Sequence, residues 1–103
     1  MKRTKSMIYK ETPESIELLL YTTNDGRIYE RSIRAAILNL QKKMKKGLYD
    51  PDKAVDLWYY IADAGSKAYY KDFGYSFNVQ DRFTVAVELE RRYREEVEEI
   101  LTA

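Results

Sequence analysis

The chain has no cysteine and no histidine among its 103 residues. Without cysteine there is no disulfide bond, no thiol nucleophile and no thiolate metal site, which suits an intracellular protein. Without histidine the chain also lacks the commonest general base and a common zinc ligand. We therefore expect no redox chemistry, no metal site and no cofactor.

Glycine and proline are scarce as well, with four and two residues. The glycines stand alone at positions 26, 47, 65 and 74, so the sequence has no glycine-rich loop that would hold a phosphate. Few helix breakers and a charged fraction of 34% favour helix. The length fits one domain, and we expect an N-terminal arm over residues 1–11 and a single helical domain over residues 12–103.

Long apolar runs are missing too. No window approaches the roughly 18 consecutive apolar residues that are needed to span a bilayer. The N-terminal stretch MKRTKSMIYKE is basic but lacks the apolar run of a signal peptide. We therefore expect a soluble protein that does not bind a membrane.

The first predicted helix is short. Thr12-Pro13 is typical of a helix start, and Asn24-Asp25-Gly26 is expected to end the helix with Asn24 or Gly26 in the left-handed conformation. A β-hairpin about the same turn is the competing interpretation, which we disfavour because the apolar residues do not alternate. The apolar face of this helix is expected to consist of Ile16, Leu19 and Leu20.

Three longer helices are predicted by apolar residues that recur at steps of three and four. They cover about residues 27–46, 51–73 and 79–101, and the second of them is expected to be central. Short connections favour antiparallel neighbours, so the predicted fold is all-α, a compact antiparallel bundle of four helices. The expected inner positions are Ile33, Ala36, Ile37, Leu40 and Met44; then Ala54, Leu57, Trp58, Ile61, Ala64 or Gly65, and Ala68; then Phe83, Ala86, Leu89, Tyr93, Val97 and Ile100.

The segment QKKMKKGLYDPDKA contains four lysines and has two interpretations. In the structural one, the lysines complement the negative end of a helix dipole, Gly47 stops that helix, and Asp50-Pro51 begins the next. In the functional one, they bind nucleic-acid phosphates together with cations of the N-terminal arm. The candidate phosphate-binding residues are Lys2, Arg3, Lys5, Lys42, Lys43, Lys45 and Lys46.

Charge is distributed unevenly along the chain. Residues 1–50 carry 11 Lys+Arg against 6 Asp+Glu, whereas residues 51–103 carry 7 against 11. This asymmetry fits either a basic face for nucleic acid or two halves that attract each other when packed. We favour the second interpretation.

Carboxylates are the remaining candidates for catalysis. Asp56 and Asp63 are seven residues apart and would share one helix face, as a magnesium or acid–base pair requires. Acidic residues are common on helix surfaces, however, and the serines have no base to activate them. We therefore expect that the protein is not an enzyme.

Tyrosine is unusually frequent, with ten residues, and forms two doublets on one predicted helix. Partly exposed tyrosines anchor protein partners and stack on unpaired bases, but they also seal the rim of a small core. Tyrosines and the small residues of the same helix would also suit a two-fold contact between copies of the chain. The candidate partner-binding residues are Trp58, Tyr59, Tyr60, Tyr69 and Tyr70.

The Gly47-x-Tyr49-Asp50 corner and its flanks resemble a set of small proteins encoded by phage and prophage genomes. The resemblance extends from about residue 20 to residue 100 and implies a viral or mobile-element origin, a compact helical fold and a location in the host cytoplasm. It implies no activity and no catalytic residues. The matching residues are Asn24, Asp25, Tyr29, Asn39, Leu40, Lys43, Gly47, Tyr49, Asp50, Lys53, Ala54, Ala68, Tyr69 and Phe73.

The sequence therefore predicts a viral accessory protein that binds another macromolecule, with a protein as the favoured partner. Sequence-independent nucleic-acid binding through the arm and corner lysines is the alternative. A carboxylate-metal enzyme is the least favoured hypothesis.

Overall fold

The computed structural model describes residues 8–102, including the side chains of residues 8–101, and is all-α. Lys2, Arg3 and Lys5 lie outside the described residues. The predicted helical fold is confirmed, and residues 14–30 form no hairpin, since the described part of the chain contains no strand. The elements are α1 (Pro13–Asn24), α2 (Gly26–Ile28), η1 (Tyr29–Ile33), α3 (Arg34–Lys45), α4 (Pro51–Phe73) and α5 (Val79–Thr102).

Helix α1 begins where the sequence predicted. Thr12 Oγ1 accepts a hydrogen bond from the backbone N–H of Ser15 at 3.0 Å, and Ser15 Oγ accepts one from the N–H of Thr12 at 2.9 Å. This reciprocal pair satisfies two N–H groups that a helix start leaves without partners.

The predicted end of α1 is wrong in its geometry. Neither Asn24 nor Gly26 has a positive φ. Instead Asp25 is extended, and its carboxylate accepts from the N–H groups of Arg27 at 2.9 Å and Ile28 at 3.1 Å. Because Asp25 caps α2 directly, the chain starts a new helix without a left-handed residue.

The apolar face predicted for α1 is correct only for Leu19, which is partly buried against the core. Ile16 and Leu20 are exposed, whereas Leu18 is fully buried together with Ser15 and Thr22. These three positions are spaced by three and four residues, so they share one side of the helix. That side packs on α4 and α5, and Thr22 lies directly against Gly65 of α4.

Residues 26–45 form one continuous helical stretch, with one π-helical turn at η1. Its predicted inner stripe is confirmed, since Ile33, Ala36, Ile37 and Leu40 are buried and Met44 is half-buried. The predicted end is confirmed as well. Gly47 has a φ of +72°, and the N–H of Leu48 donates to the carbonyl of Lys43 at 2.8 Å, which closes the last turn.

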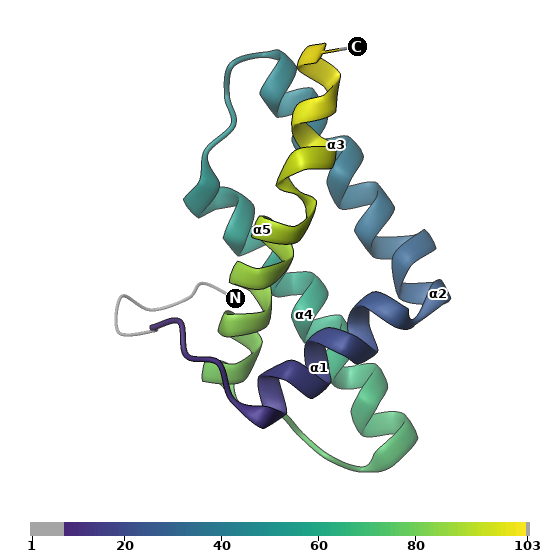
Figure 1. The fold of residues 1–103 in the computed structure, drawn as a ribbon. Coiled ribbons are helices and arrows are strands. Elements are labelled where there is room, and N and C mark those ends of the chain that lie inside the picture. The colour runs from purple at the N-terminus through teal and green to yellow at the C-terminus, as the bar shows by residue number, and fades with distance from the viewer. Residues whose placement is uncertain (1–7, 103) are drawn as a thin grey trace.

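Helix α4 begins at the predicted cap, and the end of α4 and the start of α5 are capped as well. Asp50 accepts from the N–H of Asp52 at 2.9 Å at the start of α4, Gly74 ends that helix with a φ of +73°, and Asn78 Oδ1 accepts from the N–H of Asp81 at 2.7 Å at the start of α5. Helix α4, which was expected to be central, packs against α1, α2, α3 and α5, and α5 packs against α1, α3 and α4, so the two helices share the centre of the bundle. Figure 1 shows α5 running through the middle of the molecule to the C-terminus.

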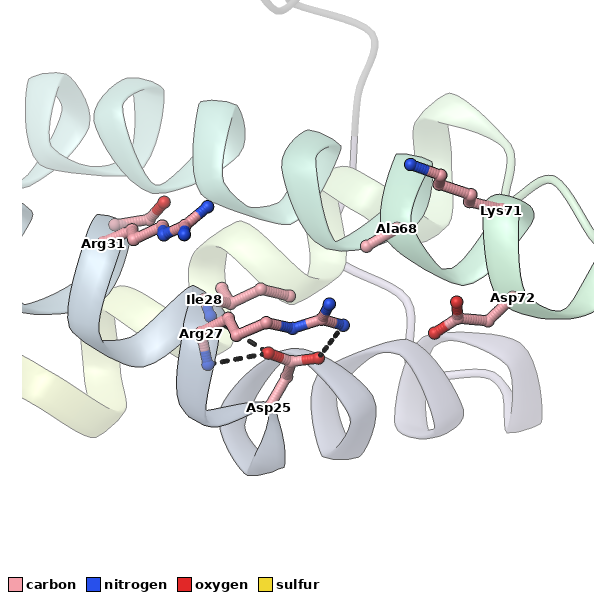
Figure 2. A pocket seen from close by; sticks show the side chains of 8 residues that line it. Asp25, Arg27, Ile28, Arg31, Ala68, Lys71 and Asp72 are labelled. Carbon is pink, nitrogen blue, oxygen red and sulfur yellow. Dashed lines mark hydrogen bonds and ion pairs between the residues drawn. The ribbon is translucent and has the colours of Figure 1, made fainter.

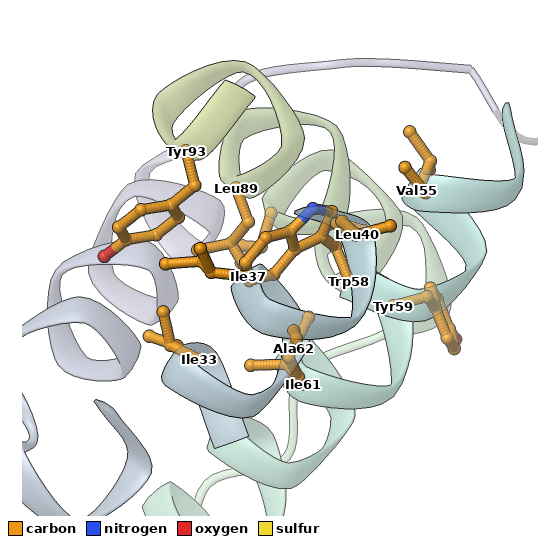
Figure 3. Close-up of a cluster of buried hydrophobic side chains, with 14 of the residues drawn as sticks. Ile33, Ile37, Leu40, Val55, Trp58, Tyr59, Ile61, Ala62, Leu89 and Tyr93 are labelled. Atoms are coloured by element: carbon orange, nitrogen blue, oxygen red, sulfur yellow. The ribbon is translucent and has the colours of Figure 1, made fainter. Parts of the chain in front are cut away.

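The core lies where α3, α4 and α5 meet. Trp58 of α4 stacks on Tyr93 of α5, with ring centroids 5.4 Å apart and an interplanar angle of 21°. Ile37, Leu40 and Leu89 surround the indole (Figure 3). Burial of such large rings dominates the stability of a small core.

Glu90 of α5 is buried, although it is not among the expected inner positions of that helix. Its carboxylate accepts from Tyr49 Oη at 2.7 Å and from Arg94 Nε at 2.7 Å. Burial opposes its ionisation, but the hydrogen bonds from Arg94 and Tyr49 outweigh that effect and leave its pKa below the ordinary value. Tyr49 lies in the loop that joins α3 to α4. Its hydrogen bond to Glu90 therefore holds this loop against α5.

The described part of the N-terminal arm, residues 8–11, lies on α5. Tyr9 donates a hydrogen bond to Glu88, and the N–H of Lys10 donates to Thr84 Oγ1 at 3.0 Å. The guanidinium of Arg91 lies 4.9 Å from the centre of the Tyr9 ring. No helix in the described residues combines the length and the apolar character needed to cross a membrane.

Candidate functional site

Two of the five predicted partner-binding residues are in the core. Trp58 is 1% exposed and Tyr59 is 2% exposed, so their candidacy as surface anchors is wrong. The reason is that α4 is buried on more than one side: Trp58 packs against Tyr93 of α5, and Tyr59 lies near Arg82 of the same helix.

The other three predicted residues lie on different sides of α4. Tyr60 and Tyr70 are exposed, and their rings form no ring pair with Tyr69. Tyr69 is half-buried and faces α1. Adjacent residues diverge by about 100° around a helix, which separates Tyr69 from Tyr70.

Five aromatic rings from α1, α4 and the connection between α4 and α5 contact one another. Tyr69 is their centre, with ring centroids 4.7 Å from Phe73, 4.9 Å from Phe77 and 5.1 Å from Tyr21. Tyr75 lies 4.9 Å from Phe77. Most pairs meet edge to face, which is a favourable ring arrangement. We call this set the aromatic face: Tyr21, Tyr69, Phe73, Tyr75 and Phe77.

Hydrogen bonds to carboxylates hold two of these rings in place. Tyr21 Oη donates to Asp72 Oδ2 at 2.7 Å, and Tyr69 Oη donates to Glu17 Oε1 at 3.4 Å. The bond to Asp72, with some burial, raises the pKa of Tyr21 to about 12. Burial, followed by the nearby charge of Glu17, raises the pKa of Tyr69. Both hydroxyls therefore stay protonated at neutral pH.

The aromatic face is only partly covered by the protein. Phe77 is 4% exposed and forms its base, whereas Phe73 is 66% exposed and Tyr75 is 47% exposed. Leu20 of α1 is also exposed beside Phe73, since both line the same hollow. Exposed apolar groups gathered in one patch are typical of interaction surfaces.

Two open hollows lie along the aromatic face and share Glu17. The first, which we call the ring-lined hollow, has a volume of ≈ 240 Å³. The second, the Leu20 hollow, has a volume of ≈ 400 Å³. The ring-lined hollow is bounded by Pro13, Glu14, Glu17, Tyr69, Tyr75 and Phe77, and the Leu20 hollow by Glu17, Leu20, Tyr21, Asn24, Asp25 and Phe73.

A third hollow, of ≈ 310 Å³, lies between the α2–η1 segment and α4 (Figure 2). Its lining includes both acidic and basic side chains. Arg27 pairs with Asp25 at 3.4 Å, and Arg31 and Lys71 lie at opposite ends of the view. The pKa of Asp25 is lowered, chiefly by its hydrogen bond from the N–H of Ile28. Because these cations do not converge, the hollow has no evident selectivity for an anion.

The four corner lysines are exposed at the end of α3, on the side of the helix opposite the half-buried Met44. Gln41 Nε2 donates to the carbonyl oxygen of Glu96 at 2.9 Å, so the acidic last turns of α5 lie next to them. Neighbouring carboxylates weaken the attraction of lysines for phosphate. The corner lysines thus share this end of the molecule with the acidic last turns of α5; they are Lys42, Lys43, Lys45 and Lys46.

Asp56 and Asp63 do not form part of a metal site within the described residues. Asp63 pairs with Arg82 at 2.9 Å and with Lys67 at 3.1 Å. Within residues 8–102 no three acidic side chains cluster in a way that would hold a metal ion.

Sequence reasoning found Tyr69 but missed the other four members of the aromatic face. A local signal was present, because residues 69–77 read YYKDFGYSF and contain five aromatic residues in nine positions. Tyr69 and Phe73 are also four residues apart, which places them on one side of a helix. The contribution of Tyr21 depends on how α1 crosses α4, and no local pattern encodes that crossing.

Comparison of the chain with models of protein families, with curated proteins and with solved structures found no match.

Proposed function

We propose that this protein acts by binding another protein, and that the aromatic face is the surface it uses. The observation that carries this proposal is the exposure of Phe73 and Tyr75 within a set of rings already held in place by mutual contacts. Aromatic side chains are enriched at protein interfaces, and rigid ones lose little conformational entropy on binding. A binding role also needs none of the nucleophile–base groups that the sequence lacks.

Affinity capture with matched variants tests the proposal. The double variant Phe73→Gln/Tyr75→Gln removes the exposed rings, and the variant Tyr60→Gln removes a tyrosine that is 54% exposed on another side of α4. We expect a defined protein from cells that encode this chain to be retained by the unchanged protein and by Tyr60→Gln. Retention should fall at least about tenfold for the double variant, as expected for loss of central interface rings.

Equal retention by both variants would refute the aromatic face as the binding surface. Circular dichroism of each variant shows whether the fold persists, because exposed rings contribute little to the core. A retained species that is a second copy of the chain would identify self-association as the interaction. Of the small residues of α4, Gly65 and Ser66 are buried, and Gly65 lies against Thr22 of α1.

The nucleic-acid alternative stays a prediction with its own signature. If the corner lysines bind phosphates, affinity for DNA falls with a log–log salt slope of about −4, and replacing the four lysines by glutamine abolishes it. The phage or prophage origin and the location in the host cytoplasm likewise stay predictions from the sequence resemblance.

A further inference from the structure

The ring-lined hollow differs from the rest of the aromatic face in its geometry. Three of its walls are rings that are nearly perpendicular to one another: the interplanar angle is 80° for Tyr69 and Tyr75, 72° for Tyr69 and Phe77, and 74° for Tyr75 and Phe77. Their centroids are 4.9 to 6.4 Å apart. The three rings therefore form the walls of a corner, with Phe77 almost fully buried behind it.

The remaining walls of the ring-lined hollow carry negative charge. Glu14 and Glu17 come from the first turns of α1, and both are exposed. The six residues that line this hollow include no cation. A cation held against aromatic rings is attracted by their electron-rich faces, and adjacent carboxylates add to that attraction.

The Leu20 hollow is also lined by two carboxylates, Glu17 and Asp25, but Asp25 is already paired with Arg27. Its apolar lining includes an aliphatic side chain, Leu20, beside the rings of Tyr21 and Phe73. The Leu20 hollow thus suits an apolar side chain, while the ring-lined hollow suits a cationic one. Glu17 lines both, so the two hollows are next to each other on one surface.

We propose that the ring-lined hollow binds an arginine side chain of the protein partner, with an apolar side chain of the same segment in the Leu20 hollow. This inference rests on the proposed function, because it names the chemistry of the partner at the aromatic face. Arginine fits better than lysine because its planar guanidinium stacks on rings and pairs with carboxylates at the same time. The chain itself has such a contact, where the guanidinium of Arg91 lies over the Tyr9 ring.

A pair of small probes tests the charge requirement. N-acetyl-arginine N-methylamide carries the guanidinium, and N-acetyl-citrulline N-methylamide is its uncharged isostere. Each is titrated into the ¹⁵N-labelled protein, and amide chemical shifts are followed by NMR. We expect saturable shifts with the arginine probe at the residues of the ring-lined hollow, with a dissociation constant on the order of millimolar, and shifts at least about fivefold smaller with citrulline.

Variants make the assignment specific. Glu17→Gln removes one carboxylate and Tyr75→Leu removes one wall, and each should weaken binding of the arginine probe by about three- to tenfold. Glu30→Gln, which alters an exposed carboxylate on η1, should leave it unchanged. Equal shifts with citrulline, or arginine shifts spread over the acidic end of α5 at Glu95 and Glu98, would overturn the inference.

The two proposals fail in distinguishable ways. If capture of the partner depends on Phe73 and Tyr75 but the arginine probe does not bind, the aromatic face remains the binding surface and only the arginine assignment is lost. If the arginine probe binds in the hollow but capture is unaffected by the double variant, the proposed function is lost and the cation preference of the hollow stands.

Discussion

At the scale of single residues, the protein contains buried charged side chains, and Glu90 is the clearest case. Its carboxylate is buried and satisfied by Tyr49 and by Arg94. A buried carboxylate with strong donors stabilises the fold only while it is ionised. Glu90 therefore links the stability of the molecule to pH.

The variant Glu90→Gln tests this link. A lowered folded-state pKa means that the contribution of Glu90 is fully present above the unfolded value of 4.5 and is lost as the pH falls through the folded value. At pH 7 we expect the free energy of unfolding to drop by about 1–3 kcal/mol in the variant. As the pH falls below 4.5, the difference in the free energy of unfolding between the unchanged protein and the variant should shrink. Urea unfolding at several pH values measures it, and a difference that does not change with pH would contradict the assignment.

The contact between Gly65 and Thr22 sets how closely α1 approaches α4. A Cβ added at Gly65 would lie 3.2 Å from Thr22 Cβ and still closer to Oγ1. The Thr22 hydroxyl is buried and forms no hydrogen bond within the described residues. The close approach therefore depends on packing rather than on a polar bond.

Gly65→Ala should destabilise the protein by about 1–3 kcal/mol, because the extra methyl group overpacks the contact. On an exposed helix position the same change would stabilise by about 1 kcal/mol, so the sign is diagnostic. In a Thr22→Ala background the cost of Gly65→Ala should largely disappear. Thermal or urea unfolding of the double-mutant cycle measures the coupling. Additive effects of the two substitutions would show that the contact is not made.

At the scale of whole elements, the helix ends were predictable because caps are local. Thr12, Asp50 and Asn78 each use their own side chain to accept a backbone N–H within three residues. Gly47 and Gly74 adopt the left-handed conformation that ends a helix. Such signals are fixed by neighbouring residues and need no knowledge of the tertiary fold.

Gly74→Ala is expected to cost about 1 kcal/mol in the free energy of unfolding, since alanine is strained at a φ of +73°. Gly26→Ala is the matched control. Its φ is not positive, it lies within α2, and nothing stands within 4 Å of the added methyl group. We expect that control to be neutral or to stabilise by up to about 1 kcal/mol. Chemical denaturation compares the two variants, and equal effects would contradict the capping role of Gly74.

Which face of a helix is buried was predictable only where the helix packs by its most apolar side. The stripe from Ile33 to Leu40 follows that rule. In α1 the rule failed, because its buried side consists of Ser15, Leu18 and Thr22, and Thr22 lies in close contact with Gly65 of α4. The burial of Glu90 could not be predicted from local sequence, because its partner Tyr49 is 41 residues away in the sequence.

At the scale of the whole molecule, the arrangement of α1 against α4 creates the aromatic face. Tyr69 and Phe73 come from one helix, Tyr21 from another, and Tyr75 and Phe77 from the connection to α5. The sequence indicated that tyrosines would matter, but it placed them on α4 alone. The site exists only because three segments meet, so its full membership could not be derived from local patterns.

Site-specific photocrosslinking tests the central claim most directly. A photoreactive benzoylphenylalanine is placed at position 73 in one variant and at position 60 in another, both in the cells that encode the protein. Both positions are exposed aromatic residues of α4 on different sides of the helix. The account predicts a crosslinked protein adduct of defined mass from position 73 and none from position 60. Adducts from position 60 alone, or from neither position, would contradict the assignment of the aromatic face as the binding surface.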